Sequence, residues 1–313
     1  MMLVSNNIAK AFLPNDIRGE YRFNAKIINW FAVDSIAEVL FKPLDFADLQ
    51  YFLQNIPQEI KINILGAASN VIIKEPILNG VLIRLGKNFD AITVEDLVPK
   101  SADEVMVTIG AGALCNSTSL YLANNGISGL EFFSGIPGNV GGAIFMNAGC
   151  YEGEVSHSLI SITATDYQGN LQVFTKEQCG FSYRLNQLMQ ERKLIILEAK
   201  FLLKNGKSTE ILEKIRQLQQ KRQDSQPIRA KTGGSTFKNP KNSHKKAWQL
   251  IDESGCRGLS CNDAKISEKH CNFLINQNNA SATDILTLIE TVQLKVFTKT
   301  KIMLELEIKI IGN

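Results

Sequence analysis

The feature that most constrains this chain is a glycine-dense stretch, GISGLEFFSGIPGNVGGAIFMNAGCYEG, at residues 126–153. It holds eight of the 22 glycines of the chain. Glycine is favoured where the backbone turns tightly, takes a positive φ or approaches another group closely. Flexible Gly/Ser linkers lack large apolar side chains, whereas leucine, isoleucine, valine, methionine and phenylalanine run through this stretch. We therefore predict a packed segment of tight turns and not a linker.

The composition limits the class of protein and its partners. The chain has 313 residues, 44% of them hydrophobic, which is enough for two or three domains with buried cores. Its net charge of +3 suits small phosphorylated ligands and argues against nucleic acid as a partner. No window holds the roughly 18 apolar residues of a membrane span, and the first residues lack the apolar core of a signal peptide. We therefore expect a cytoplasmic protein with no membrane partner.

Six cysteines and three histidines raise the question of a metal or a disulfide. No two cysteines have CxxC spacing, so reduced thiols are expected. Cys256, Cys261, His270 and Cys271 lie close together in sequence, but their irregular spacing favours ordinary thiols over metal ligands. The sequence therefore predicts no bound metal.

The hydrophobic periodicity predicts mixed strands and helices. Strands are expected where short apolar runs end at turn residues, at 37–43, 61–65, 71–73, 105–109, 159–165, 171–174 and 194–203. Helices are expected at 46–53, 110–125, 208–224, 247–254 and 284–298. The apolar stripe of the last helix is Ile285, Leu288, Ile289, Val292, Val296 and Phe297. Residues 1–24 show little periodicity and predict an irregular lead-in.

The closing stretch, KIMLELEIKII at residues 301–311, alternates between apolar and other residues. A period of two predicts a strand with one buried face. One side carries Ile302, Leu304, Leu306, Ile308 and Ile310. The other side carries Glu305, Glu307 and Lys309.

Two loops have compositions that suit phosphate binding. In GAASN, at residues 66–70, consecutive backbone N–H groups would form an anion-binding nest, and a plain tight turn is the alternative. In TGGSTFKNP, at residues 232–240, a serine follows two glycines. The GAG at residues 110–112 does not complete a dinucleotide-binding fingerprint, because Cys115 stands where the third glycine is needed. A P-loop is excluded too, since no Gly-Lys-Ser/Thr follows a glycine cluster.

The order of these motifs resembles the UDP-N-acetylenolpyruvoylglucosamine reductase family from about residue 29 to residue 312. The FAD-binding half of that family is similar to LGAASN at 65–70, GLEF at 129–132, GIPGNVGGA at 135–143 and MNAG at 146–149. The second half is similar to YR at 183–184, GSTFKNP at 234–240, SEKH at 267–270, NF at 272–273 and LELE at 304–307. The chain resembles the branch of the family that lacks a tyrosine-bearing insertion.

The resemblance implies an α+β fold. It would have a two-part FAD-binding domain of the vanillyl-alcohol-oxidase type and a C-terminal α+β substrate domain. The expected parts are an FAD-binding subdomain at 1–85, a second at 86–204 and a substrate domain at 205–313. The final strand, at about 301–312, is expected to return to the FAD part.

The resemblance also implies an activity, namely NADPH-dependent reduction of UDP-N-acetylglucosamine enolpyruvate to UDP-N-acetylmuramate. FAD would carry the hydride, with flavin N5 passing it to the vinyl carbon of the substrate. This reaction is a step of peptidoglycan precursor synthesis. The implied partners are the UDP-sugar substrate and NADPH, and we expect a monomer.

The family's motifs assign roles to residues of this chain. Arg184 and Glu307 would hold and polarise the carboxyl end of the substrate, and Ser235 would protonate the alpha carbon. The implied cofactor-binding residues are Leu65, Gly66, Ala67, Ala68, Ser69, Asn70, Gly135, Gly138, Asn139, Gly141, Gly142 and Asn147. The implied substrate-binding residues are Tyr183, Lys231, Lys238 and Asn239. From the residues alone, Ser235 as a turn residue, Arg184 in a surface ion pair and Glu307 as a solvated position stay open.

Some positions depart from the family pattern. Ala67 and Ala68 stand where glycines are usual, Asp34 replaces a glycine, and Asn262 with Asp263 replaces a glycine pair. Added methyl groups would crowd the diphosphate of FAD, and Asp34 would repel it if it faced inward. Two alternatives follow. One is a flavin-dependent oxidase of related fold on another small substrate, and the other is a degenerate member that binds a nucleotide as a regulator.

Overall fold

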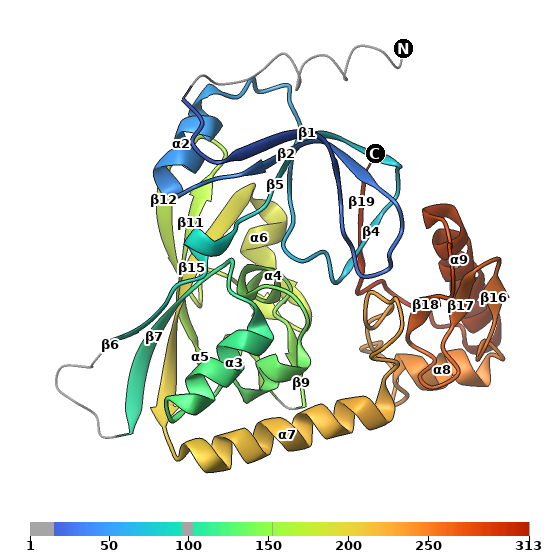
Figure 1. The fold of residues 1–313 in the computed structure, drawn as a ribbon. Coiled ribbons are helices and arrows are strands. Elements are labelled where there is room, and N and C mark those ends of the chain that lie inside the picture. Colours follow the sequence, from blue (N-terminus) through green and yellow to red (C-terminus); the bar gives the residue numbers. More distant parts are fainter. Residues whose placement is uncertain (1–15, 96–102, 152, 313) are drawn as a thin grey trace. The chain divides into compact units, whose positions relative to one another are not determined.

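The computed structural model describes residues 16–95, 103–151 and 153–312 (Figure 1). Contacts within the chain define two compact units, each made of three segments. Unit 1 takes in Met1–Ala25, Glu38–Gly66 and Asn79–Gln220, and unit 2 takes in Lys26–Ala37, Ala67–Leu78 and Lys221–Asn313. The division into residues 1–85, 86–204 and 205–313 stays a prediction.

The first sheet of unit 1 packs on one helix. The sheet has the order β1-β2-β5-β3, with β3 parallel to β5. The elements are β1 (Glu20–Lys26), β2 (Ile36–Lys42), α2 (Phe46–Asn55), β3 (Ile62–Ile64) and β5 (Ile77–Ile83). The rings of Phe41 and Phe52 are fully buried, with 4.5 Å between their centroids.

Strand β1 corrects the irregular lead-in that the sequence predicts for residues 1–24. That prediction is wrong for residues 20–24, because they pair with β2. Pairing with the next strand stabilises an extended segment whose own periodicity is weak. Residues 1–15 of the same prediction lie outside the described residues.

The second sheet of unit 1 is antiparallel. Its order is β12-β11-β15-β7-β6, and β8 also pairs with β15. The strands are β6 (Ile92–Glu95), β7 (Glu104–Gly110), β8 (Ile127–Ser128), β11 (Leu159–Asp166), β12 (Leu171–Thr175) and β15 (Leu194–Asn205). The strands predicted at 159–165 and 171–174 are confirmed, and they form a hairpin in which β11 pairs with β12 from Ser161 opposite Thr175 to Thr165 opposite Leu171.

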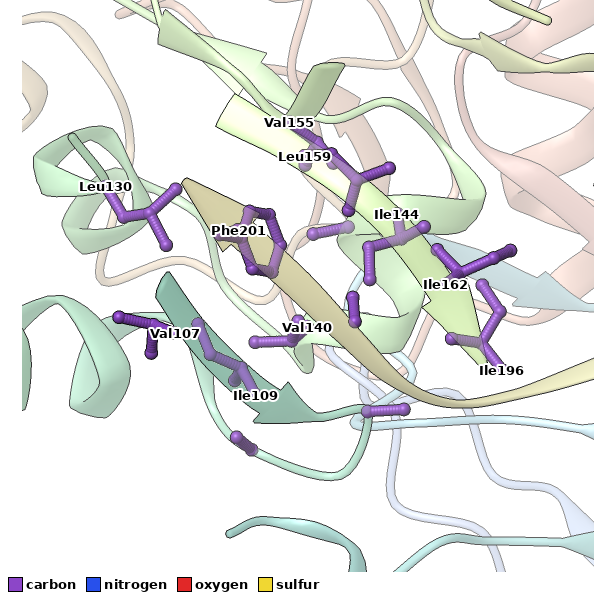
Figure 2. Packing of buried hydrophobic residues seen from close by; sticks show 14 of the residues in the cluster. Val107, Ile109, Leu130, Val140, Ile144, Val155, Leu159, Ile162, Ile196 and Phe201 are labelled. Atoms are coloured by element: carbon purple, nitrogen blue, oxygen red, sulfur yellow. The ribbon is translucent and has the colours of Figure 1, made fainter. Parts of the chain in front are cut away.

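The glycine-dense stretch packs against this second sheet, which confirms the prediction of a packed segment. It forms β8, η2 (Glu131–Gly135), α4 (Val140–Phe145), β9 (Gly149–Cys150) and the start of β10 (Gly153–Glu154). Helix α4 contacts β7 and β15. Figure 2 shows Val140 and Ile144 of α4 among Ile109, Ile162 and Phe201 of the sheet, and all five side chains are fully buried. The stretch is therefore part of the core and not a linker.

The other elements of unit 1 are short, apart from α7. They are η1 (Lys87–Phe89), α3 (Cys115–Asn124), α5 (Val155–Ser158), β13 (Phe181–Ser182), β14 (Leu185–Asn186), α6 (Gln187–Glu191) and α7 (Ser208–Ser225), which continues into unit 2. Helix α3 starts five residues later than the predicted start at 110. The reason is that the N–H groups of Gly110, Ala111 and Gly112 donate to carbonyls of residues 91, 197 and 89 instead of opening a helix.

Unit 2 contains the long helix α9 (Ala282–Thr300). Ser281 caps its N-terminus, because the serine hydroxyl accepts a hydrogen bond from the N–H of Asp284 at 3.1 Å. The predicted stripe is buried at Ile285, Leu288, Ile289, Val292 and Val296. Phe297 is the exception, with 41% of its surface exposed.

The remaining elements of unit 2 come before and after α9 along the chain. They are β4 (Val71–Ile73), α8 (Ala247–Glu253), β16 (Ser260–Cys261), β17 (Ala264–Ile266), β18 (Leu274–Asn276) and β19 (Lys309–Ile311). Strands β16, β17 and β18 form an antiparallel sheet, and β19 runs parallel to β4. Helix α9 contacts β16, β17 and α8, which buries its apolar stripe.

The closing stretch differs from the predicted strand over 301–311. Only its last part, β19, is a strand, and it pairs with a segment of residues 1–85. Before β19 the backbone is irregular, because the N–H of Glu307 donates to the carbonyl of Thr236 at 2.9 Å. Leu304 and Ile308 are buried as the alternation predicts, whereas Ile310 is 43% exposed.

Two findings concern membranes and thiols. Over the described ranges, no helix combines the length and the apolarity needed to cross a membrane. All six cysteines are free thiols, and Cys115, Cys179, Cys256 and Cys271 are buried.

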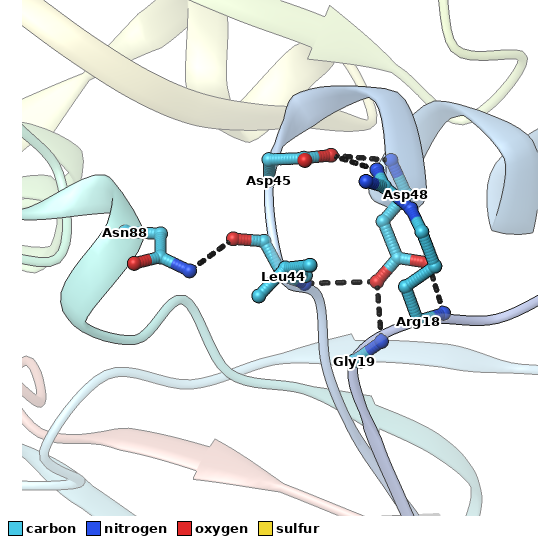
Figure 3. A network of polar contacts seen from close by, with 6 residues as sticks. All are labelled: Arg18, Gly19, Leu44, Asp45, Asp48 and Asn88. Atoms are coloured by element: carbon cyan, nitrogen blue, oxygen red, sulfur yellow. Dashed lines mark hydrogen bonds and ion pairs between the residues drawn. The ribbon is translucent and has the colours of Figure 1, made fainter.

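Asp48 fixes the start of β1 beside α2 (Figure 3). Its carboxylate is 2% exposed and accepts hydrogen bonds from the N–H groups of Arg18 and Gly19 at 2.9 Å and of Leu44 at 2.8 Å. Asp45, the N-cap of α2, accepts from the N–H of Asp48 at 2.9 Å and forms an ion pair with Arg18. One buried side chain therefore satisfies three backbone donors that have no strand partner.

Replacing Asp48 tests this reading of the fold. We expect Asp48→Ala to lower the free energy of unfolding by about 3 kcal/mol, because it leaves buried N–H groups without an acceptor. Urea unfolding followed by circular dichroism measures the change. Asp90→Ala removes an exposed carboxylate of the same unit and should change stability by less than about 0.5 kcal/mol. Equal stability of the two variants would contradict the role of Asp48.

Candidate active site

The first predicted cofactor loop begins at Leu65 and Gly66 in unit 1. Leu65 is buried and donates its N–H to the carbonyl of Ile83 at 3.2 Å. Gly66 has no room for a side chain, because an added Cβ would lie 2.4 Å from Oδ1 of Asn139. Its carbonyl oxygen accepts two hydrogen bonds from Arg84, from Nε at 2.9 Å and from Nη2 at 2.7 Å. The glycine is therefore required by packing at this position.

The rest of that loop, Ala67 to Asn70, belongs to unit 2. Ala68 is buried and has φ of +51°, a conformation that costs a non-glycine residue roughly 1–2 kcal/mol. Asn70 donates from Nδ2 to the carbonyl of Glu307 at 3.2 Å and accepts from the N–H of Lys309 at 3.0 Å. The loop is thus tied to the segment that carries Glu307. The role of Ser69 toward a cofactor stays a prediction.

Asp34, the residue that would repel a diphosphate, is an exposed member of unit 2. Its side chain is 91% exposed and pairs with Nζ of Lys26 at 3.0 Å. An ion pair between two exposed side chains contributes little to stability. The carboxylate therefore does not face the interior of its unit.

The second predicted cofactor segment surrounds α4. Gly138 has φ of +105°, which favours glycine. A Cβ on Gly141 would lie 2.9 Å from that of Ala111, and a Cβ on Gly135 would lie 3.1 Å from Sγ of Cys150. Gly142 differs, because a Cβ there would meet no heavy atom within 4 Å. One face of this short helix is thus packed by glycines, and Gly142 opens onto free space.

Two asparagines hold the second segment in place. Asn139 donates from Nδ2 to the carbonyl of Gly112 at 2.6 Å. Asn147 is fully buried with φ of +42°, and its amide bonds to Glu154, to the carbonyl of Ser182 and to the N–H of Ser156 at 3.0–3.2 Å. The side chain of Asn147 is therefore used within unit 1, and its contact with a cofactor stays a prediction.

Arg184 and Tyr183 form the turn between β13 and β14 in unit 1. Arg184 has φ of +54°, a strained conformation for a residue with a side chain. Its guanidinium donates to the carbonyl of Gly149 at 2.6 Å and lies over the ring of Tyr183, 5.0 Å from the centroid. Backbone strain at a residue with a predicted catalytic role is typical of functional sites.

Ser235 lies in a segment of unit 2 that is fixed on both sides. It bridges to Phe273, and the next residue, Thr236, donates to the carbonyl of Asn272 at 2.8 Å and accepts from Glu307 at 2.9 Å. Within the part of the chain that the structure describes, the Ser235 hydroxyl has no hydrogen-bond partner. Gly234, just before it, has φ of +85° and no atom within 4 Å of an added Cβ. The hydroxyl is thus held by the backbone and left available to a ligand.

Glu307 lies two residues before Lys309 in the closing stretch. Burial lowers the pKa of Lys309, and the nearby charge of Lys238 lowers it further. Lys238 also forms an ion pair with Glu305 at 3.7 Å. The side chain of Glu305 is 78% exposed, whereas Glu307 is partly buried. Of the two carboxylates of LELE, Glu307 therefore has the more enclosed position.

Two other predicted substrate residues have partners within unit 2. Lys231 donates from Nζ to the carbonyl of Asn278 at 2.9 Å. Asn239 accepts on Oδ1 from the N–H of Ala247 at 3.0 Å, at the start of α8. These contacts give both residues a structural role, and their roles toward substrate stay predictions.

The predicted catalytic residues are divided between the units. Arg184 belongs to unit 1, with Leu65, Gly66 and the segment around α4. Ser235 and Glu307 belong to unit 2, where Thr236 joins their backbones. The structure therefore brings Ser235 and Glu307 onto adjacent segments.

The histidine and cysteine cluster has no metal-binding arrangement. Across residues 16–95, 103–151 and 153–312, no group of three or more histidine, cysteine or acidic residues could hold a metal ion. His270 accepts on Nδ1 from the N–H of Asn272 at 3.2 Å, and burial lowers its pKa. Burial also raises the pKa of Cys271 to about 11. Both groups are therefore neutral near pH 7.

Sequence reasoning missed Arg84, and it gave Asn272 no role although NF at 272–273 is one of the family motifs. Asn272 holds the Ser235 segment through both ends of its amide, because Oδ1 accepts from Phe237 at 3.0 Å and Nδ2 donates to the carbonyl of Phe237 at 2.8 Å. The sequence feature that could have indicated Arg84 is its position directly after the apolar run VLI at 81–83. The strand ends there, beside the loop at 65–70. Such contacts depend on the fold, so no spacing rule predicts them.

Comparison with known proteins agrees with this geometry. Residues 226–311 match the family model for the C-terminal domain of UDP-N-acetylenolpyruvoylglucosamine reductase, and residues 37–175 match an FAD binding domain. The reductases of that name from Rickettsia bellii and Orientia tsutsugamushi are 44% and 42% identical to this chain over 299 residues. The alignments cover 95% of this chain and 95% and 96% of theirs.

A solved structure gives the same result at the level of the fold. The crystal structure of UDP-N-acetylenolpyruvylglucosamine reductase from Thermus caldophilus matches with a TM-score of 0.76 and 31% identity. The match covers 94% of this chain and 99% of that one. The α+β fold with an FAD-binding half and a separate C-terminal domain is therefore confirmed.

Alanine at two glycines tests the packing of the cofactor segments. Gly66→Ala should lower the free energy of unfolding by roughly 1–3 kcal/mol, because its methyl group displaces the amide of Asn139. Gly142→Ala should be neutral or stabilising by up to about 1 kcal/mol, because it meets no atom and favours a helix. Thermal unfolding of the flavin-free chain measures both. If Gly142→Ala lost more stability than Gly66→Ala, Gly66 would not be the tightly packed glycine and Gly142 would not be the open one.

Proposed function

The chain belongs to the UDP-N-acetylenolpyruvoylglucosamine reductase family, and on that premise we propose that it reduces UDP-N-acetylglucosamine enolpyruvate to UDP-N-acetylmuramate. It is an FAD-dependent oxidoreductase of peptidoglycan precursor synthesis, with NADPH as co-substrate. The observation that carries this conclusion is the 44% identity to a relative of that name over 95% of the chain. Monomeric state and cytoplasmic location stay predictions from the sequence.

The proposed FAD-binding residues include one position where a ligand can reach the backbone. The open space at Gly142 beside tightly packed glycines leaves room for a ligand to approach the backbone. The residues proposed to hold FAD are Leu65, Gly66, Ala67, Ala68, Ser69, Asn70, Gly135, Gly138, Asn139, Gly141, Gly142 and Asn147. When bound, FAD takes a hydride from NADPH and supplies it to the enolpyruvyl double bond.

Ser235 is the proposed acid. Reduction of the double bond requires a proton at the alpha carbon, next to the substrate carboxylate. A serine hydroxyl is a weak acid in water, but a basic carbon held close to it accepts its proton, so positioning outweighs a matched pKa. The support is local, since the Ser235 hydroxyl has no partner among the described residues while Thr236 and Asn272 fix its backbone.

Arg184 and Glu307 are proposed to bind and polarise the carboxyl end of the substrate. A guanidinium forms strong, charge-assisted hydrogen bonds with a carboxylate. The strained backbone at Arg184 supports a functional role. For Glu307, the support is its partly buried position on a segment bonded to Thr236 and Asn70.

Among the proposed substrate residues, Lys238 is the one that we propose binds the phosphates of the UDP-sugar. It lies near Lys309, and two neighbouring ammonium groups attract a polyanion. Its ion pair with the exposed Glu305 is long, at 3.7 Å, and is readily exchanged for a phosphate. Tyr183, Lys231 and Asn239 are the further proposed contacts.

The purified chain should be yellow and should release FAD on denaturation. It should oxidise NADPH in the presence of UDP-N-acetylglucosamine enolpyruvate and only slowly in its absence. Absorbance at the flavin and NADPH bands measures both, with UDP-N-acetylglucosamine as the matched control ligand. Rapid reoxidation by oxygen alone would favour a flavin oxidase, and binding of a UDP-sugar without flavin would favour a regulator.

Ser235→Ala separates the two halves of the reaction. NADPH should still bleach the flavin of this variant, but turnover should fall by roughly 10²–10⁴-fold, the range for loss of a general acid. Ser260→Ala, at an exposed serine of the same unit, is the control and should keep normal turnover. If Ser235→Ala turned over within about twofold of the control, the assignment of the acid would be wrong.

A further inference from the structure

Arg84 is a partly buried cation of unit 1 that the structure pairs with a carbonyl instead of a carboxylate. Its own N–H donates to the carbonyl of Phe41 at 3.0 Å, which fixes its backbone at the end of β5. Nε and Nη2 both donate to the carbonyl oxygen of Gly66. Burial lowers the pKa of the guanidinium. Burying a charge is unfavourable unless a partner of opposite charge is present.

Four other arginines of the described residues have such a partner. Arg18, Arg22, Arg216 and Arg257 form ion pairs with carboxylates. Over residues 16–95, 103–151 and 153–312, Arg84 has no carboxylate within ion-pair distance. Its two bonds to Gly66 leave the Nη1 amino group and one N–H of Nη2 for another acceptor.

The orientation of this guanidinium is fixed by a connected set of contacts in unit 1. Arg84 holds the carbonyl of Gly66, Asn139 lies against the Cα of Gly66, and Asn139 donates to the carbonyl of Gly112 at 2.6 Å. The set therefore joins the two predicted cofactor segments, the loop at 65–70 and the segment around α4. A fixed guanidinium loses little entropy on binding a phosphate, whose oxygens match its N–H fork.

We propose that Arg84 binds the diphosphate of FAD, with its bonds to Gly66 holding the guanidinium in the required orientation. The proposal rests on the FAD-binding function proposed above. A diphosphate is also present in the UDP-sugar and in NADPH. FAD is the favoured source because Arg84, Gly66, Gly112 and Asn139 all lie within residues 37–175, which match an FAD binding domain.

The test compares flavins with and without phosphates on the full-length chain. Quenching of flavin fluorescence gives the dissociation constants of FAD and riboflavin for flavin-free wild type, Arg84→Gln, Arg84→Lys and the control Arg216→Gln. Arg84→Gln should weaken FAD by roughly 10–100-fold, as expected for losing charged hydrogen bonds, and riboflavin by less than about threefold. Arg84→Lys keeps the charge without the fork and should fall between wild type and Arg84→Gln. Should Arg84→Gln not fold, as judged by circular dichroism, Arg84→Lys alone carries the comparison.

Each other outcome overturns the proposal in a different way. Equal loss of FAD and riboflavin means that Arg84 only shapes the loop. An unchanged FAD constant with a raised KM for the UDP-sugar, or for NADPH, assigns Arg84 to that diphosphate. If Arg84→Gln binds FAD as tightly as Arg216→Gln does, Arg84 has no role in FAD binding. The proposed function still stands in that case, provided that the wild type binds FAD. A wild-type chain that binds no FAD rejects both.

Discussion

Close backbone contact between α4 and the loop after β7 is the constraint on which unit 1 depends. The N–H of Gly141 donates to the carbonyl of Ala111 at 2.9 Å, and no side chain fits between the two segments. Because α4 is fixed at this depth, Asn139 reaches the carbonyl of Gly112 and lies against Gly66. Most glycines of the stretch thus serve contacts within the protein.

Unit 2 uses the same principle with a different result. An added Cβ on Gly233 would lie 2.4 Å from the ring of Phe31, whereas one on Gly234 would meet nothing within 4 Å. The segment therefore has a packed side and an open side one residue apart. Ser235 follows on a backbone that Thr236 anchors through Asn272 and Glu307. A rigid backbone with one rotatable hydroxyl is suited to delivering a proton in a defined direction.

The sequence predicts the fold well where the apolar pattern is long and local. Helices α7, α8 and α9 and the hairpin of β11 and β12 follow from periodicity. Periodicity predicts the closing stretch less well, because Glu307 bonds to Thr236 and only β19 becomes a strand. Catalytic roles come from resemblance, because no local pattern separates Glu305 from Glu307. Neither periodicity nor family resemblance predicts a role for Arg84, because its contact with Gly66 joins a strand end to a loop 18 residues earlier.

The parallel pair of β4 and β19 has a consequence for how the chain folds during synthesis. It joins residues 71–73 to residues 309–311, so unit 2 is complete only when almost the whole chain has been made. Unit 1 ends at residue 220. Chains fold from the N-terminus as they emerge, and long-range pairing is slow. The apolar strand β4 thus waits without its partner through the synthesis of more than two hundred residues. During this interval the unpaired edge of β4 is exposed, so unit 2 is the part of the nascent chain most prone to aggregation.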